Sequence, residues 1–258
     1  MLIDTHAHLN EPVFAERLPA VIARALSQGV THCIVPAYDV ASLERTRMLH
    51  AAYPAFIHPA YGIHPWFIEE GFDTAALVPY LEKGDAIAIG EIGLDYGFGE
   101  IPPEVQKTVL IRQVEMSIEY QLPVIVHCRK AFDELYAIMS EYRNEVRGVM
   151  HSFSGSLEWL HRFVDLGWYI SFSGSVTRKS ARKYHRNAQA VPADRYLLET
   201  DAPSIATETT VASDVEPDHL IEVAEKMAEL RGETMEQIIS DSSANARRLF
   251  RFPGDSPS

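Results

Sequence analysis

Short apolar runs rich in β-branched residues alternate along the chain with longer segments in which apolar residues recur at helical spacing. The apolar runs lie at residues 1–3, 30–35, 55–61, 86–90, 123–126, 146–150, 168–172 and 195–198. Runs of this length predict buried strands, and apolar positions three or four apart, as in residues 105–118 and 132–139, predict amphipathic helices. The pattern therefore predicts about eight strands with helices between them.

Strands that alternate with helices favour a parallel sheet with right-handed crossovers. An open doubly wound sheet would normally carry a glycine-rich phosphate loop after its first strand, and here histidines follow that strand instead. Eight strand–helix units close naturally into a barrel, and 258 residues is an ordinary length for one. We therefore expect an α/β fold of the TIM-like (β/α)8 barrel class.

A single domain is expected at residues 1–252, because no internal repeat or low-complexity linker divides the chain. Two helical patterns at residues 217–230 and 234–250 follow the last predicted strand and would add C-terminal helices to the barrel. Residues 253–258 are expected to form a flexible tail.

Acidic residues outnumber basic ones, which gives the chain a formal net charge of −13. Proteins that coat nucleic acid by broad electrostatic attraction carry basic faces, so any contact with nucleic acid should be local or metal-assisted. The sequence shows neither a signal peptide nor the run of about twenty apolar residues that a membrane span requires. A cytoplasmic protein that does not enter a membrane is expected.

Residues that commonly bind metals stand at the ends of the predicted strands. His6 and His8 follow the first run, and alternate side chains of extended backbone point the same way, so this pair could share a cation. Later strand ends supply His64, Glu91, His127, His151 and Asp201. A histidine at one strand end is more often a hydrogen-bonded structural residue than a ligand. Together, however, these side chains would be left unpaired at one end of a barrel without a cation, so they predict a metal site.

Glu91 is the residue expected to lie between two cations, because its carboxylate has two oxygens and follows an uninterrupted apolar run. Asp95 is expected to cap or brace its loop rather than bind metal. The remaining histidines, among them His32 and His58, lie within predicted strands or helices and are expected to be surface or packing residues.

In their combination and order, these motifs resemble the TatD family of metal-dependent hydrolases, within the amidohydrolase superfamily of barrels. The resemblance extends from Leu2 to Phe250. It rests on His6 and His8, the Gly-Ile-His-Pro turn at residues 62–65, residues 90–95, Gln106, Gln113, His127, Arg129, residues 151–155 and residues 199–203. The motifs are specific because they occur together and in this order.

The resemblance implies two divalent metal ions as cofactors. The implied ligands are His6, His8 and Asp201 for one ion, His127 and His151 for the other, and Glu91 as the bridge. His64 would lie beside the metals and contact the scissile group. Family members are typically deoxyribonucleases that remove nucleotides from DNA ends with magnesium or manganese, and some relatives are thought to act on other esters.

Two such cations would lower the pKa of a water molecule and neutralise charge on an acyl or phosphoryl oxygen. Asp201 is the expected general base. His64 and Arg129 would steady a phosphate, although Arg129 could equally form a structural pair with a nearby acid. Histidine-rich sites favour zinc, manganese or iron, whereas magnesium prefers oxygen ligands. The sequence therefore leaves magnesium, manganese and zinc as alternative identities of the metal.

Two loops depart from the family pattern. In the family the loop after the last acid usually carries an arginine, but residues 202–230 contain none, and the expected asparagine-glutamate-proline reads Val-Glu-Pro at residues 215–217. The loop after Asp95 also lacks its usual basic residue. Arg178 and Lys179, in a basic segment, are the remaining candidates to bind a nucleic-acid backbone, although this segment could equally be a solvated helix face.

DNA, as a single strand or a frayed end, is the expected substrate of a deoxyribonuclease of the 3′–5′ exonuclease type. Trp66, Tyr96 and Phe98 on the rim loops could stack its bases or simply pack. The missing arginine favours an alternative, a hydrolase of a non-nucleic-acid ester or amide, of the deacylase or lactonase type. A scaffold for a partner protein is a third interpretation, and the complete ligand set argues against it.

Overall fold

The computed structural model describes residues 1–68 and 71–252. Within this part, the chain forms eight strands in two parallel sheets, with the orders β1-β2-β3 and β4-β5-β6-β7-β8. The strands are β1 (Leu2–Asp4), β2 (Val30–Pro36), β3 (Ile57–Ala60), β4 (Ile89–Asp95), β5 (Val124–Arg129), β6 (Gly148–Met150), β7 (Tyr169–Phe172) and β8 (Tyr196–Leu198). Within each sheet, every strand lies beside the one that follows it in the sequence.

Backbone hydrogen bonds connect the two sheets on both sides. Between β3 and β4, Ile87 N–H donates to Pro59 O (3.0 Å). Between β8 and β1, Thr5 N–H donates to Leu198 O (3.1 Å). The strands thus follow one another around a ring, and the predicted TIM-like (β/α)8 barrel is confirmed.

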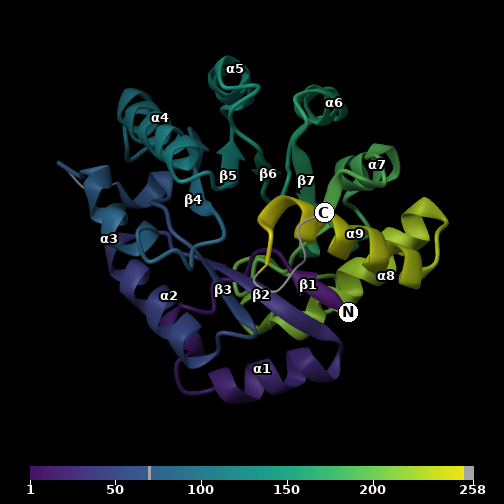
Figure 1. Cartoon of the computed structure of the whole chain (residues 1–258). Coiled ribbons are helices and arrows are strands. Elements are labelled where there is room, and N and C mark those ends of the chain that lie inside the picture. Colours follow the sequence, from purple (N-terminus) through teal and green to yellow (C-terminus); the bar gives the residue numbers. More distant parts are fainter. Residues whose placement is uncertain (69–70, 253–258) are drawn as a thin grey trace.

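Helices surround the strands, as Figure 1 shows. They are α1 (Leu18–Ser27), α2 (Val40–Ala52), α3 (Val78–Leu81), α4 (Pro103–Glu119), α5 (Phe132–Glu141), α6 (Leu157–Asp165), α7 (Arg182–Ala190), α8 (Leu220–Arg231) and α9 (Met235–Phe250). The last two both follow β8, as the two C-terminal helical patterns predict.

Local sequence signals set the ends of these helices. Asp39 caps α2, because its carboxylate accepts the backbone N–H of Ser42 (2.6 Å) while the Ser42 hydroxyl accepts the backbone N–H of Asp39 (2.9 Å). At its carboxyl end, α8 stops at Gly232, whose backbone is left-handed with a φ of 66°.

The second of two apolar clusters shows how the barrel is closed at its amino end. Residues from different strands, among them Ile3, Ile34 and Ile125, lie in this cluster together with Leu249 and Phe250 at the end of α9. Helix α9 also packs against β1 and β8. It therefore covers the amino end, and the loops at the carboxyl ends of the strands are left to form a site.

Two strands extend further than their apolar runs predict. The strand predicted at residues 86–90 is β4, which runs to Asp95, and the one predicted at residues 123–126 is β5, which runs to Arg129. Glu91 and His127 therefore lie within strands rather than after them. The physical reason is that β4 and β5 stay paired up to their ends, whereas an apolar run stops at the first polar side chain.

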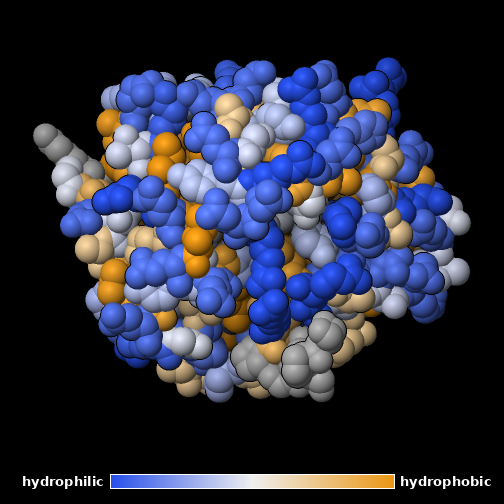
Figure 2. Space-filling model, turned by 45° about the horizontal axis from the view of Figure 1, so that its top comes forward, coloured by the Kyte–Doolittle hydropathy of each residue, from blue (hydrophilic) through white to orange (hydrophobic). Residues whose placement is uncertain are grey.

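Hydrophilic residues dominate the face drawn in Figure 2, and apolar residues show there only as separate patches. None of the helices within the described residues combines the length and the apolar character that crossing a bilayer would take. The tail predicted at residues 253–258 lies outside the described residues, and the domain boundary at residue 252 stays a prediction.

Candidate metal and active site

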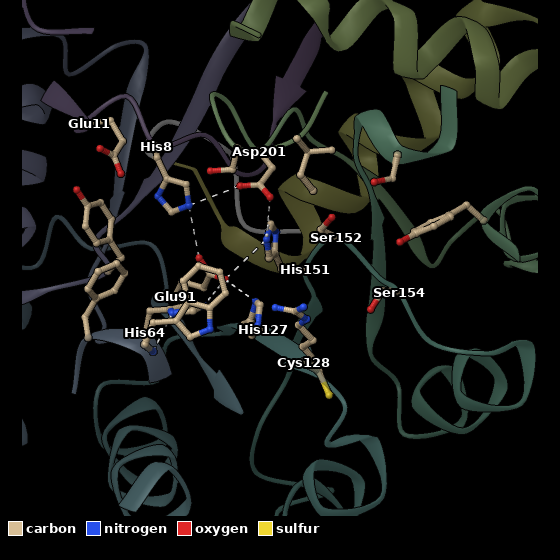
Figure 3. Close-up of a pocket in the computed structure, with 18 residues that line it drawn as sticks. His8, Glu11, His64, Glu91, His127, Cys128, His151, Ser152, Ser154 and Asp201 are labelled. Atoms are coloured by element: carbon tan, nitrogen blue, oxygen red, sulfur yellow. Dashed lines mark hydrogen bonds and ion pairs between the residues drawn. The ribbon is translucent and has the colours of Figure 1, made fainter. Parts of the chain in front are cut away.

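The two histidines after β1 face two carboxylates at the carboxyl end of the barrel. Nε2 of His6 lies 3.1 Å from Nε2 of His8 and 3.2 Å from Oε2 of Glu91. Nε2 of His8 lies 3.5 Å from the same Glu91 oxygen and 3.6 Å from Oδ1 of Asp201. Figure 3 shows His8, Glu91 and Asp201 pointing toward one another. Four side chains thus direct atoms that can bind a cation toward one point.

Asp4, at the end of β1, holds this first group in place. Its Oδ1 accepts the backbone N–H groups of His6 (3.2 Å) and Thr200 (3.0 Å), and its Oδ2 accepts the Thr200 hydroxyl (2.6 Å). Burial raises the pKa of Asp4 to about 7, although these hydrogen bonds act to lower it. Asp4 therefore ties the loop of His6 to the loop of Asp201, a role that the sequence analysis missed.

A second group of histidines faces the other oxygen of Glu91. This oxygen, Oε1, lies 3.3 Å from Nδ1 of His127, 3.7 Å from Nε2 of His151 and 3.6 Å from Nε2 of His64. Nε2 of His151 also lies 3.5 Å from Oδ2 of Asp201. Both carboxylates therefore present one oxygen to the first histidine group and the other oxygen to the second.

Glu91 reaches its central position because β4 and β5 approach each other closely. Gly93, with a φ of 152°, permits this approach, since a Cβ there would lie 2.0 Å from the backbone oxygen of His127. Burial opposes the ionisation of Glu91, but the imidazoles of His151 and His64 hold its pKa well below its usual range. An ionised carboxylate thus stands at the centre of the site.

Two further carboxylates determine which ring nitrogen of two histidines faces the centre. Oδ2 of Asp95 lies 2.9 Å from Nε2 of His127, which leaves Nδ1 of that ring directed at the centre. Oε1 of Glu199 lies 2.8 Å from Nδ1 of His151, which leaves Nε2 directed at the centre. A carboxylate behind an imidazole fixes its tautomer and raises its basicity, an arrangement typical of metal-binding histidines.

His64 is held in a different way from the other four histidines. Its Nδ1 accepts the backbone N–H of Trp66 (3.1 Å), so the neutral ring carries its proton on Nε2. Burial lowers the pKa of His64 to about 3, which keeps the ring neutral at pH 7. Gln113 fixes the turn by accepting the Ile63 N–H (2.8 Å) and donating to the Ile63 carbonyl (3.2 Å). His64 therefore presents a hydrogen-bond donor rather than a lone pair.

Arg129 lines the cavity of about 360 Å³ into which these groups open. Its guanidinium lies over Gly97, where a Cβ would come within 2.9 Å of the Arg129 Nε. An ion pair with a nearby acid was the alternative role expected for Arg129. No such pair is found among the described residues. The charge of Arg129 is therefore available to an anionic group in the cavity.

Arg178 and Lys179 do not line this cavity. Nη2 of Arg178 donates to the carbonyl of Ala206 (3.3 Å), and Nζ of Lys179 lies 3.6 Å from Oε1 of Glu208. Both side chains thus contact the long loop after β8. The structure does not bring them together with the other predicted site residues.

The long loop after β8 is anchored through the Glu-Pro pair of the Val-Glu-Pro tripeptide. Glu216 is buried, accepts a hydrogen bond from Nε of Arg24 (2.9 Å) and lies 3.0 Å from Nη1 of Arg17. Its neighbour Pro217 begins a 3-10 turn before α8. The pair therefore ties the loop to α1. To the cavity the loop contributes Ser204 but no cation.

The donor set fits divalent cations. Burial lowers the pKa of His8 to about 4, so this ring is neutral and free to bind a metal. Burial opposes ionisation of Asp201 as well, but His151 lowers its pKa. Burial also disfavours a charge on His151, but Glu199 and the central carboxylates raise its pKa well above its usual value. A cation would replace the positive charge that His151 now supplies to these carboxylates.

Comparisons with known proteins find relatives along nearly the whole chain. The model of a family described as TatD related DNase matches residues 3–251. The chain is 37% identical to the uncharacterized metal-dependent hydrolase YabD of Bacillus subtilis over 255 residues, which cover 98% of this chain and 100% of that protein. It is 30% identical to the 3′-5′ ssDNA/RNA exonuclease TatD of Erwinia billingiae over 260 residues, which cover 98% of this chain and 100% of that protein.

A solved structure shows the same fold. The crystal structure of YjjV, a TatD homolog from Escherichia coli K12, matches with a TM-score of 0.92 at 33% sequence identity, and the match covers 98% of each chain. This similarity confirms the barrel class, and the family expected from the motifs is confirmed by the match to the family model.

Proposed function

Because the chain belongs to the TatD related DNase family of metal-dependent hydrolases, we propose that it is a 3′–5′ exonuclease acting on the ends of single-stranded DNA with two divalent metal ions. One observation carries the proposal: Glu91 and Asp201 each present one oxygen to His8 and the other to the second histidine group. Two shared cations are the arrangement used for in-line displacement at phosphorus. The name of the Erwinia billingiae relative supports this chemistry.

The proposed ligands are His6, His8 and Asp201 for one ion, His127 and His151 for the other, and Glu91 as the bridge. When bound, the two cations would lower the pKa of a water molecule and offset the negative charge that develops on the phosphate. Nitrogen-rich ligands favour manganese or zinc over magnesium. We therefore propose tighter binding of manganese or zinc, with magnesium as the weakest of the three.

The residues of the chain complete the reaction. Asp201, ionised and next to both histidine groups, accepts a proton from the attacking water. The water oxygen bonds to phosphorus while the bond from phosphorus to the 3′ oxygen of the preceding nucleotide breaks. His64 Nε2–H and Arg129 donate hydrogen bonds to the nonbridging phosphate oxygens. The 3′ oxygen takes a proton from solvent, and a 5′-mononucleotide leaves.

A gel assay tests this function. The protein is incubated with a 5′-labelled single-stranded DNA oligonucleotide and manganese or magnesium, with Asp201→Asn as the control. A ladder that shortens from the 3′ end only with the unchanged protein supports the proposal, and an intact oligonucleotide with every metal overturns it.

Arg178 and Lys179 are proposed to contact longer strands, so a double alanine variant should bind long oligonucleotides less tightly and cut dinucleotides normally.

A second candidate function is favoured by the charge of the cavity wall. Glu11 lies beside His8 at the mouth, as Figure 3 shows, and its carboxylate would repel a phosphate. Because the long loop after β8 adds no cation, an uncharged ester or amide would enter without this penalty. This candidate is a hydrolase of the deacylase or lactonase type. Metal-dependent turnover of an aminoacyl ester or a lactone by protein that leaves DNA intact would support it.

A further inference from the structure

The mouth of the cavity has two chemically different halves. Aromatic rings stand on the half built by the loops after β2, β3 and β4. Tyr38, Trp66 and Phe67 line the cavity there, and Phe98 stacks on Trp66; we call these four residues the aromatic rim. Hydroxyl groups stand on the half built after β6, β7 and β8, and they belong to Ser152, Ser154, Ser175 and Ser204 and to one tyrosine, Tyr184 of α7. Figure 3 shows Ser152 and Ser154 across the cavity from Glu11.

The aromatic rim is only partly covered by its own contacts. The rings of Trp66 and Phe98 are stacked, with centroids 4.9 Å apart and an interplanar angle of 21°, and the centroids of Tyr38 and Phe67 lie 5.2 Å apart. Yet Phe67 is 40% exposed and Phe98 is 37% exposed. Single exposed apolar side chains are common on protein surfaces, but these two rings belong to aromatic pairs beside a cavity, and apolar surface gathered at a cavity is typical of a binding site. Apolar surface therefore remains at the mouth for a flat ligand.

The rim is connected directly to the metal site through Asp95. Trp66 Nε1–H donates to Asp95 Oδ2 (2.8 Å), and the same oxygen lies 2.9 Å from His127 Nε2. The other oxygen of Asp95 accepts the backbone N–H groups of Gly97 (2.8 Å) and Phe98 (3.0 Å). One buried carboxylate thus sets the positions of a proposed metal ligand and of two rim residues. The rim is held at a fixed place relative to the reacting phosphate.

We propose that the aromatic rim is a subsite that stacks the unpaired base of the terminal nucleotide while its phosphate lies beside Glu91 and Asp201. This inference rests on the proposed exonuclease function and adds what the enzyme recognises, namely the flat face of a base that has left the duplex. Stacking on aromatic side chains tolerates every base, because each has a π-face. A base that stays within a duplex has its faces covered by its neighbours, so single strands and frayed ends would be preferred.

The first experiment compares two 5′-labelled single-stranded oligonucleotides that differ only at the 3′-terminal nucleotide, which is either normal or abasic. Alanine substitutions that remove one stacked aromatic side chain weaken binding roughly 10-fold to 100-fold. We therefore expect the unchanged protein to show a KM for the abasic substrate higher by about that factor, with kcat changed less than about twofold.

The variant Phe67→Ala/Phe98→Ala should erase this difference between the two substrates, because it removes the exposed rings and leaves the metal ligands in place. Leu26→Ala, which truncates an exposed apolar side chain on α1, is the matched control and should retain the full difference. Equal KM values for both substrates with the unchanged protein would overturn the proposed subsite while leaving the exonuclease proposal intact.

A binding measurement separates the two proposals. Asp201→Asn protein, which should not cut, is titrated with the normal and the abasic oligonucleotide while fluorescence anisotropy is recorded. Tighter binding of the normal strand that disappears with Phe67→Ala/Phe98→Ala supports the subsite, even if the unchanged protein cuts no DNA and the exonuclease proposal falls. Equal binding of both strands overturns the subsite whatever the outcome of the cleavage assay.

Discussion

Two groups of histidines lie at opposite ends of the barrel, and in each group two ring nitrogens lie about equally close together. At the carboxyl end, Nε2 of His6 lies 3.1 Å from Nε2 of His8. Near the amino end, Nδ1 of His32 lies 2.9 Å from Nε2 of His58. Closeness of two imidazoles is therefore common to both ends and cannot by itself identify a metal site.

The neighbours of the two groups differ in charge. Glu91 and Asp201 stand between the histidines of the carboxyl end, whereas at the amino end Nη2 of Arg247 lies 3.3 Å from Nε2 of His32 and the Phe252 ring lies 4.8 Å from the ring of His58. Burial lowers the pKa of His58 to about 3, and the positive charges of its neighbours act in the same direction. Carboxylates make one group suitable for a cation, whereas burial and nearby positive charge keep His58 of the other group neutral.

The largest effect is expected from removing a carboxylate at the carboxyl end. Asp201→Asn should lower the rate of metal-dependent hydrolysis by roughly 100-fold to 10,000-fold, because the general base and a metal ligand are lost together. His58→Gln, which changes a histidine at the amino end, should leave the rate within about twofold. Steady-state kinetics and metal content by mass spectrometry measure both variants. A metal content that fell in His58→Gln and stayed normal in Asp201→Asn would place the metal at the amino end and contradict the prediction.

Removal of metal should destabilise the protein only through the site at the carboxyl end of the barrel. A ligand present at 100 times its dissociation constant adds about 2.7 kcal/mol to the free energy of unfolding. Treatment with a chelator should therefore lower the melting temperature of the unchanged protein and of His58→Gln, but not that of Glu91→Gln, which lacks the central charge. Thermal unfolding with and without added manganese checks this. An equal chelator effect in all three proteins would mean that metal binds elsewhere.

A smaller effect is expected from the carboxylate behind a ligand histidine. Asp95→Asn removes the charge next to His127 and gives that ring surroundings closer to those of His58. Loss of such a partner costs about 10-fold to 100-fold in metal affinity or activity. We expect the metal concentration for half-maximal activity to rise by that factor, with activity restored at high metal. Glu199→Gln, behind His151, is the parallel variant. A fall in activity that added metal does not restore would contradict this role for Asp95.

Much of the fold and most of the candidate site could be predicted from the sequence, because both follow local rules. Apolar runs and helical spacing are properties of neighbouring residues, and parallel strands bring their carboxyl ends together whatever lies between them. His6, His64 and His151 are 58 or more residues apart along the chain, and the barrel alone explains why they meet. The strand ends were less predictable, since the pairing of β4 with β5 resumes after Glu91 and continues to Asp95.

Contacts between distant side chains could not be predicted in this way. Asp4 binds Thr200, which lies 196 residues away, and nothing in the local pattern distinguishes Asp4 from a surface acid. The link from Trp66 through Asp95 to His127 joins the turn after β3 to the strands β4 and β5, and no local pattern shows that these three side chains meet. Only the burial of Asp4, which the structure shows, reveals that this carboxylate needs hydrogen-bond partners.

The smallest expected effect concerns pH and belongs to the amino end. The pKa of His58 is about 3 in the folded protein and near 6.5 when unfolded, so below pH 6.5 the unfolded chain takes up a proton that the folded chain does not. Stability present above pH 6.5 is therefore lost as the pH falls, by about 1 kcal/mol at pH 5.5 for this one group. Urea unfolding of chelator-treated protein between pH 7.5 and 5.5 should show a steeper fall for the unchanged chain than for His58→Gln. His8 and His64, whose pKa values are also lowered, contribute equally to both proteins, so the difference isolates His58. Parallel pH dependences would show that His58 gains a proton in the folded protein, and the neutral state of His58 would no longer distinguish the two ends.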